Sequence, residues 1–293
     1  MRVVVCLCVA GLAGACGARR GQSLDIARVL RESDAALKSA AQKAEQAGPP
    51  AKAPQVTIEQ HDPKLAIALV AVAARPTADN HRAAAAEYTR LRVFDKADEH
   101  LSRAIAADRH NGALFDARAR VRRDMGAAGL ALPDAWRAWY YRPAAATANT
   151  LGTVFEAAGN LPEARRWYGR ALEAQPKAWF ALNNVCHAET MLGLTTAKDA
   201  CQRSLAAAPS SRVARHNLAL AQAAAGEFAQ ARQSFSSSDT PATAAYNMGI
   251  VFMATRQFDR AVAELTTASA AAPTSTQIRA RLAQASSAQH LQP

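Results

Sequence analysis

Histidine is the first residue type to consider for chemistry in this chain, because imidazole serves both as a metal ligand and as an acid–base catalyst. The seven histidines are scattered, and none stands in the His-Glu-x-x-His spacing that holds zinc on one face of a helix. The sequence also has no Gly-x-Ser-x-Gly turn for a nucleophilic serine and no glycine-rich phosphate loop. Glu156 and Glu163 are expected to be ordinary carboxylates on helix surfaces. We therefore predict no catalytic residue, metal site, cofactor or small-molecule substrate, and we do not expect an enzyme.

A pattern of large and small residues returns about every 34 residues, which is the period of a helix–turn–helix repeat. In the clearest copy, 145–178, small residues let two antiparallel helices approach closely, and large residues fill the space beside them. A glycine permits the turn between the helices, and a proline ends the second helix. These positions are Gly152, Phe155, Gly159, Ala164, Tyr168, Ala171 and Pro176.

This pattern resembles the tetratricopeptide repeat (TPR). The resemblance implies an all-α fold, a right-handed superhelical solenoid of antiparallel helix pairs with a C-terminal capping helix. One pair cannot bury its apolar face alone, so several must stack. The register predicts about six repeats over 78–275 and a capping helix over 276–289. In the fifth repeat the second helix is expected to be short and to end in the run Ser236-Ser237-Ser238-Asp239.

The second repeat departs from the pattern, because Arg118 and Arg122 fall where inward-facing residues are expected. Two explanations remain open from the sequence. Either the register is shifted there, or the two arginines extend out of the interface along their apolar stems.

The amino terminus predicts export and lipidation. Residues 1–15 have a short basic start and an apolar run that is too short to span a bilayer, as in a secretory signal peptide. The run ends in Leu12-Ala13-Gly14-Ala15-Cys16, which resembles a bacterial lipobox. That resemblance implies cleavage before Cys16, an acyl anchor on Cys16 and, with Gly17 next, delivery to the outer membrane, facing the periplasm. The alternative is an ordinary secreted protein cut after Ala15.

The residues between the predicted anchor and the array are less regular. Over 16–61 we expect a lipidated N-terminus, a weakly amphipathic helix and a proline-rich linker, which together tether the array. Asp62 and Pro63 are typical of a helix start, with Asp62 as the N-cap. Residues 62–77 are therefore predicted to form a degenerate cap at the front of the array.

Two cysteines, Cys186 and Cys201, would remain after signal cleavage and lipidation. In the TPR register they fall on the two helices of the fourth repeat, on either side of its turn. An even number of cysteines in an oxidising compartment predicts a disulfide between them. The alternative is that both are small apolar thiols of the core.

In some TPR proteins the first helix of each repeat lines a concave groove and carries an asparagine that bonds the backbone of an extended peptide. An amide suits that role because it both donates and accepts hydrogen bonds. The matching positions here are Asn184, Asn217 and Asn247. The third copy has Thr150 at this position with Asn149 beside it, and Asn183 flanks Asn184; His187, His216 and Tyr246 share the inferred groove side. Alternatively, these asparagines are solvated surface residues or links between repeats.

The net charge of +11 gives a weaker indication. Arg120 and Arg123 would face the groove and could hold an acidic peptide or anionic lipid headgroups. The alternative is an ordinary solvated basic face. We expect no nucleic-acid partner, because no nucleic-acid-binding module is present in the sequence.

These features together predict a non-catalytic scaffold lipoprotein of the bacterial envelope that binds a protein or an extended peptide in its groove. Its layout resembles that of pilus-assembly lipoproteins of the Tad and type IV systems. Two alternatives stay open. One is an adaptor for peptidoglycan enzymes or outer-membrane protein assembly, and the other is a self-associating structural protein of the envelope.

Overall fold

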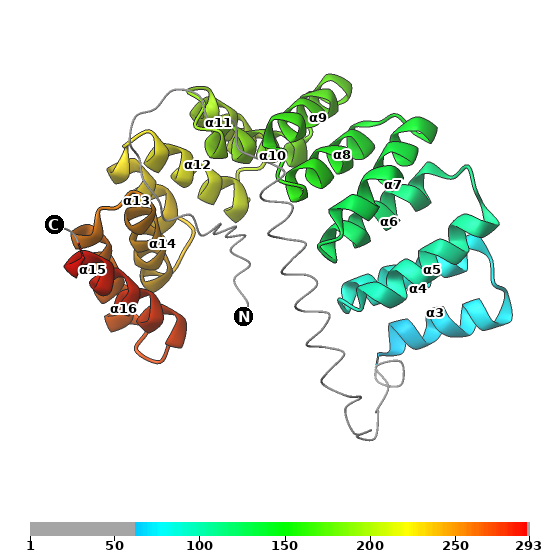
Figure 1. Cartoon of the computed structure of the whole chain (residues 1–293), viewed down its shortest axis with the longest axis horizontal. Helices are drawn as coiled ribbons and strands as arrows, with labels where there is room; N and C mark the ends of the chain where they lie inside the picture. The colour runs from blue at the N-terminus through cyan, green and yellow to red at the C-terminus, as the bar shows by residue number, and fades with distance from the viewer. Residues whose placement is uncertain (1–61, 292–293) are drawn as a thin grey trace. The chain divides into compact units, whose positions relative to one another are not determined.

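The computed structural model describes residues 62–291, which are helical apart from short turns and contain no strand (Figure 1). The prediction of an all-α fold is confirmed. The predicted signal peptide, Cys16 and the tether lie outside the described residues. The helices are α3 (Pro63–Ala74), α4 (Ala78–Arg90), α5 (Phe94–Ala107), α6 (Gly112–Asp124), α7 (Ala128–Tyr141), α8 (Ala145–Ala157), α9 (Leu161–Ala174), α10 (Trp179–Met191), α11 (Ala197–Ala207), α12 (Arg212–Ala224), α13 (Phe228–Ser236), α14 (Pro241–Ala254), α15 (Phe258–Ala271) and α16 (Thr276–His290).

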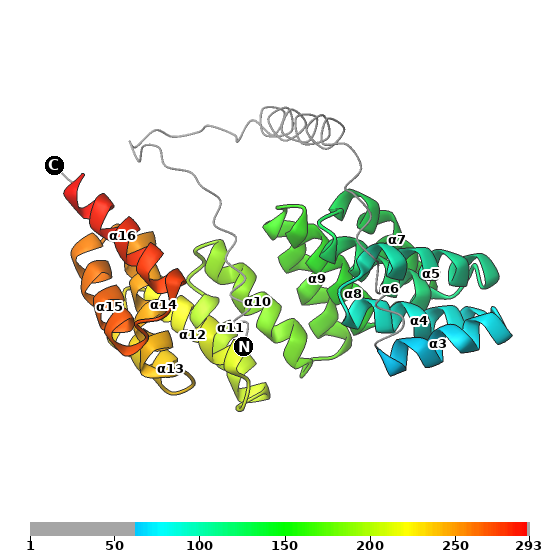
Figure 2. The same cartoon turned by 90° about the horizontal axis from the view of Figure 1, so that it is seen from below.

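From α4 to α15 the helices form six pairs. We call the first helix of each pair an A helix (α4, α6, α8, α10, α12, α14) and the second a B helix (α5, α7, α9, α11, α13, α15). Each B helix packs against its own A helix and against the A helix of the next pair, and α16 covers α15 (Figures 1 and 2). The A helices of the middle pairs also pack against one another, α6 against α8, α8 against α10 and α10 against α12. This A-to-A contact aligns one stripe of A-helix side chains along successive pairs.

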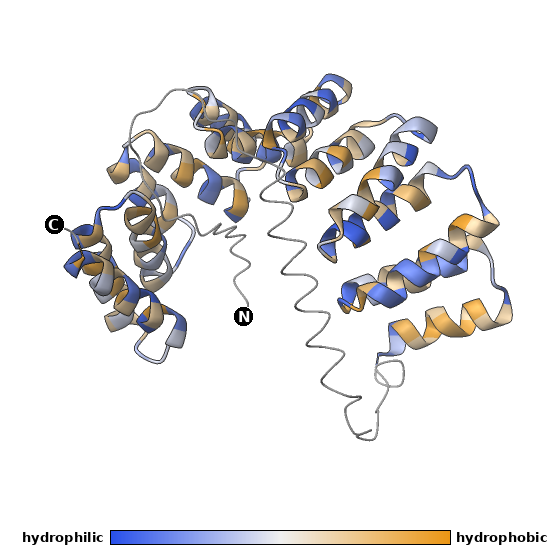
Figure 3. Ribbon diagram, in the orientation of Figure 1, coloured by the Kyte–Doolittle hydropathy of each residue, from blue (hydrophilic) through white to orange (hydrophobic). Residues whose placement is uncertain are grey.

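The helix α3 packs on α4 at the front of the array. It begins as predicted at Asp62, whose side chain accepts hydrogen bonds from the backbone N–H groups of Lys64 and Leu65. Leu65 is fully buried, whereas Ile67 is 71% exposed. Figure 3 shows that α3 is apolar over most of its length.

The turn between the two helices of each pair contains one residue in the left-handed backbone region. In the middle four pairs this residue is a glycine, as for Gly159 with φ 78°. In the first and last pairs it is Arg92 (φ 62°) and Arg256 (φ 58°). A residue with a Cβ atom adopts the left-handed region only at a cost in free energy. The packing of the two helices, and not the turn residue alone, therefore imposes the turn geometry.

The close approach of α8 and α9 depends on Gly152. A Cβ atom added there would overlap the ring of Tyr168 and lie 3.1 Å from the carbonyl oxygen of Ala164. Tyr168 is fully buried, so its ring has no free space to enter. Gly249 has the same role in the sixth pair, where an added Cβ would lie 2.6 Å from Cγ of Leu265.

Replacing Gly152 by alanine should lower the free energy of unfolding by about 1–3 kcal/mol, because an overpacked core must move a buried side chain. Gly169 in α9 is the matched control, since a Cβ added there meets nothing within 4 Å. The change Gly169→Ala should raise stability by about 0.5–1 kcal/mol, through helix propensity. Urea titrations followed by circular dichroism measure both. Equal effects of the two substitutions would contradict this packing.

In the second pair, Arg118 and Arg122 follow neither explanation left open by the sequence. Both converge on Asp134 of α7, whose side chain is 1% exposed. Arg118 donates from Nε and Nη2 to the two carboxylate oxygens, each at 2.8 Å, and Arg122 donates from Nη1 to Oδ2 at 2.8 Å. Arg122 also donates to Asp98 of α5 at 2.6 Å. The two arginines therefore do face inward, because the carboxylates of Asp134 and Asp98 neutralise their charges.

In the first pair, two buried histidines face each other. His81 of α4 and His100 of α5 are 5% and 7% exposed, and their Nδ1 atoms lie 3.0 Å apart. Burial lowers the pKa of both rings, and the charge of Arg103 lowers each further. For His100 the other ring and Lys96 act in the same direction, and Glu99 opposes them. One ring must donate while the other accepts, and the lowered pKa values of both rings favour their neutral forms.

In the folded chain the pKa of both histidines lies below the ordinary value of 6.5. As the pH falls past 6.5, the unfolded chain therefore binds more protons than the folded chain. The free energy of unfolding should therefore be constant above about pH 7 and fall as the pH drops below about 6.5. Urea midpoints at several pH values measure this slope. The double change His81→Gln and His100→Gln should flatten it, whereas His290→Gln, at an exposed site, should not. An unchanged slope in the double variant would show that other groups set the pH dependence.

Candidate functional site

The A helices α10, α12 and α14 present one stripe of side chains spaced three or four residues apart, which places them on one side of each helix. We call this stripe the A-helix face. Its asparagines and histidines are polar, and its other side chains are apolar. Its residues are Asn183, Asn184, His187 and Met191 on α10; Val213, His216, Asn217 and Leu220 on α12; and Asn247, Ile250 and Met253 on α14.

The asparagines of this face link neighbouring A helices. Asn184 Nδ2 donates to Asn149 Oδ1 of α8 at 2.8 Å, across 35 residues of sequence. Asn217 Nδ2 donates to Asn183 Oδ1 at 3.0 Å, across 34 residues. All four side chains are half-buried. The structure thus places them in the inter-repeat links that the sequence left as one alternative, and each link fixes the orientation of two amides.

Asn247 makes a different link. Its Nδ2 donates to Oδ2 of Asp239 at 3.0 Å, in the turn after the short helix α13. The Asp239 side chain is fully buried, and it also lies 2.6 Å from Nη2 of Arg212 and 2.7 Å from Nε2 of His216. The serine run ends α13 after nine residues, as predicted, and so brings this carboxylate beneath the face. The role of Asp239 was missed from the sequence, because nothing in the run indicated that its carboxylate turns inward.

His187 also joins two pairs. Its Nε2 lies 3.3 Å from Oε1 of Glu156 on α8, and Tyr168 donates to Oε2 of the same carboxylate at 2.5 Å. Burial acts to raise the pKa of Glu156, but the hydrogen bonds from His187 and Tyr168 outweigh it and lower the pKa. Burial and the neighbouring carboxylate raise the pKa of Tyr168. Glu156, which was expected to be an ordinary surface residue, is instead a structural acceptor between α8, α9 and α10.

Tyr246 does not lie on the surface as expected. It is 6% exposed, and its hydroxyl accepts a hydrogen bond from Gln277 Nε2 of α16 at 3.0 Å. The final helix covers the ring because α16 occupies the place that the next A helix would take. Tyr246 is therefore part of the core and not a contact residue.

The two arginines predicted for the groove differ in their surroundings. Arg123 Nη1 donates to the hydroxyl of Thr153 on α8 at 2.8 Å, and its Nη2 donates to Asp124 at 2.7 Å. Arg120 is exposed. Burial raises the pKa of the nearby Asp116, against the opposing effects of Thr150 and Arg120. Only Arg120 of the two thus has its charge exposed on the surface.

Three apolar side chains of the A-helix face are exposed to solvent. Met191 is 53% exposed, Val213 58% and Leu220 40%, while Ile250 and Met253 are half-buried. Val213 had not been singled out from the sequence. Its position three residues before His216, on the same side of α12, was the signal that could have found it.

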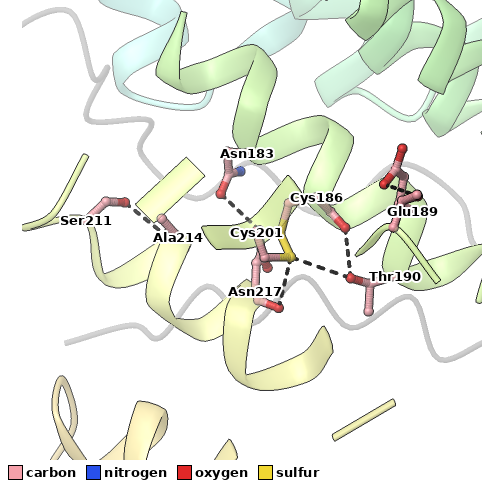
Figure 4. Close-up of a disulfide and its surroundings, with 9 residues drawn as sticks. Asn183, Cys186, Glu189, Thr190, Cys201, Ser211, Ala214 and Asn217 are labelled. Atoms are coloured by element: carbon pink, nitrogen blue, oxygen red, sulfur yellow. Dashed lines mark hydrogen bonds between the residues drawn. A yellow bond between two sulfur atoms is a disulfide. The ribbon is translucent and has the colours of Figure 1, made fainter. Parts of the chain in front are cut away.

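The two cysteines are joined. Cys186 of α10 and Cys201 of α11 form a disulfide with their Cα atoms 4.6 Å apart (Figure 4). The hydroxyl of Thr190 lies 3.8 Å from the sulfur of Cys201, and both cysteines are fully buried. The bond ties together the hairpin that carries the asparagines of α10.

Within residues 62–291, no three histidine, cysteine, aspartate or glutamate side chains are grouped to hold a metal ion. In the same part of the chain no helix has the length and apolar character needed to cross a membrane.

No family model matches the sequence, and no curated protein matches it. Solved structures do resemble the fold. A chain of the APC/C hetero-tetramer Cut9–Hcn1 matches with a TM-score of 0.62 and 17% identity. The match covers 76% of this chain and 46% of the chain from that complex. PilW, a type IV pilus biogenesis factor, matches with a TM-score of 0.60 and 20% identity, over 70% of this chain and 98% of PilW. PilF of Pseudomonas aeruginosa matches with a TM-score of 0.55 and 16% identity, over 71% and 97% of the two chains. The described part of this chain is therefore an array with the tetratricopeptide repeat fold.

Proposed function

We propose that this protein is a non-catalytic scaffold that binds a protein segment on its A-helix face. The observation that carries the proposal is the row of exposed apolar side chains on α10 and α12, where Met191, Val213 and Leu220 are each at least 40% exposed. Large apolar side chains gathered on one side of successive helices mark a contact surface, whereas single exposed ones do not.

The amides beside this row supply hydrogen-bonding groups. In each Asn–Asn link one N–H group and one carbonyl oxygen are used. An amide has two N–H donors and an oxygen with two lone pairs, so every linked asparagine keeps bonding capacity. Because the links hold the side chains in place, a partner's backbone would meet groups that are already oriented, which lowers the entropy cost of binding.

The proposed setting is the bacterial envelope. The apolar start and the lipobox-like run before Cys16 support an exported chain with an acyl anchor on the periplasmic side of the outer membrane. The likeness to PilW, a type IV pilus biogenesis factor of which 98% is covered, supports a role in assembling a pilus. The partner would then be a protein of that assembly.

The binding proposal is tested by capture on the immobilised chain from residue 17 onward, from envelope extract of the source bacterium. The double change Val213→Asp and Leu220→Asp alters the A-helix face at exposed positions, where the fold is not at risk. Leu130→Asp, at a 62% exposed position on the B helix α7, is the matched control. We expect one protein, identified by mass spectrometry, to be captured by the unchanged and control chains and lost from the double variant. Equal capture by all three, with equal helicity, would refute binding at this face.

A further inference from the structure

The B helix α7 carries large aromatic side chains on its outer surface. Trp136 is 43% exposed, Tyr140 78% and Tyr141 38%. Trp136 and Tyr140 are four residues apart and therefore lie on the same side of the helix.

The other B helices have no such residues at the corresponding places. Each B helix has one fully or nearly fully buried alanine near its start, which is Ala131 in α7. The position corresponding to Trp136 holds Ser102, Gly169, Gln202, Ser236 and Thr266 in the other five B helices. The position corresponding to Tyr140 holds Ala106, Glu173, Ala206 and Ala270, since α13 ends before it. Five pairs fold with small or polar residues there, so the solenoid does not require the aromatic ones.

The aromatic side chains are held firmly at their base. The ring of Trp136 packs edge-on against Trp167 of α9, with ring centres 5.1 Å apart, and Trp139 packs against the same ring at 5.4 Å. Tyr140 packs against Tyr141 at 5.2 Å, and Tyr141 stacks on Phe115 at 5.8 Å. A surface of rigid aromatic side chains loses little conformational entropy when it is covered.

The surface around these rings is basic. Residues 128–144 and 161–179 contain the basic residues Arg137, Arg142, Arg165, Arg166, Arg170 and Lys177. The acidic residues in these two stretches are Asp134, Glu163 and Glu173. Asp134 is buried beneath this surface, where it is paired with Arg118 and Arg122 of α6 and also lies 3.6 Å from Arg137. The side chains of Arg137, Arg166 and Arg170 are 57%, 75% and 64% exposed, and Arg166 and Arg170 lie 3.1 Å and 4.0 Å from Glu163 and Glu173. With six basic and three acidic residues, the two stretches keep a net charge of +3.

We propose that this surface, formed by Trp136, Tyr140 and Tyr141 with the surrounding arginines, binds the surface of an anionic lipid bilayer. Tryptophan and tyrosine rings favour the boundary between headgroups and acyl chains, where one end of the ring is apolar and the other is wet. Arginines beside them are attracted to anionic headgroups. The contact goes beyond the proposed scaffold function and needs no acyl group on Cys16. It uses a B helix and leaves the A-helix face free for a protein.

Co-sedimentation with vesicles tests the inference, using the chain from residue 17 onward without an acyl group. We expect binding to vesicles containing phosphatidylglycerol, weaker binding at high salt, and little binding to phosphatidylcholine alone. The double change Trp136→Ser and Tyr140→Ala, which installs the residues of the first pair, should weaken binding by about tenfold or more, or about 1.4 kcal/mol per factor of ten. The double change Val213→Ser and Leu220→Ser on the A-helix face should leave it unchanged.

Failure of the unchanged chain to bind anionic vesicles would overturn the inference, as would equal binding by the Trp136 and Tyr140 variant. Loss of a captured protein from that variant, with vesicle binding intact, would instead make the surface a protein interface and would also overturn it. The capture experiment on the A-helix face is independent, so either proposal can fail while the other stands.

Discussion

Replacing Asp134 by alanine should lower the free energy of unfolding by about 3–5 kcal/mol, which is the cost of leaving a buried ion pair without one partner. The Asp134 side chain is 1% exposed, and the side chains of Arg118 and Arg122 are 12% and 19% exposed. Without the carboxylate, Arg118 would keep the hydroxyl of Ser102 at 3.0 Å and the ring of Phe115, while Arg122 would keep Asp98. Urea unfolding followed by circular dichroism measures the loss.

Two further variants show whether the loss of stability comes from this ion-pair network or from removing any carboxylate. Glu173→Ala, at a 71% exposed site 4.0 Å from Arg170, should change stability little. Asp134→Leu combined with Arg118→Met should recover most of the loss, since an apolar replacement of both partners removes the unpaired charge. A small effect of Asp134→Ala, similar to that of Glu173→Ala, would show that water reaches the two arginines.

Breaking the Cys186–Cys201 disulfide should lower the free energy of unfolding by about 3 kcal/mol in the chain-entropy account, because the bond closes a loop of 15 residues. The effect should be strongest locally, since α11 has 11 residues and no side-chain cap at its start. Hydrogen exchange after reduction should show α10 and α11 losing protection before the other helices.

The double variant Cys186→Ala and Cys201→Ala is the control for the reductant. It should unfold at the same urea concentration with and without dithiothreitol, whereas the unchanged chain should shift. If the unchanged chain unfolds at the same urea concentration in both conditions, the disulfide does not contribute to stability as expected.

The helix pairs could be predicted from the sequence because their rules are local in each repeat. Gly152 and Tyr168 lie 16 residues apart, yet the same small and large residues recur in the next copies, so the contact can be read from the period. The end of α13 was predictable for the same reason, since the serine run interrupts the pattern. The ion-pair network of Arg118 could not be predicted, because Asp134 lies in another helix and no sequence periodicity relates the two residues.

The candidate site was only partly predictable. The sequence identified the right asparagines, but whether an amide points to solvent or to the next repeat depends on the distance between A helices, which periodicity does not give. Tyr246 illustrates a second limit. Its position in the repeat is that of a surface residue, and only the packing of α16 against the array buries it. The aromatic residues of α7 were missed as a surface feature because the repeat pattern draws attention to the positions that all copies share.

The central claim, that a protein partner binds the A-helix face, is tested most directly by photo-crosslinking in living cells. A photoreactive amino acid placed at Leu220 would lie on the A-helix face, and one at Leu130 would lie on a B helix. We predict one specific adduct with a protein of the envelope from position 220 and none of the same mass from position 130. The same adduct from both positions, or an adduct from position 220 only with a second copy of this chain, would contradict the account.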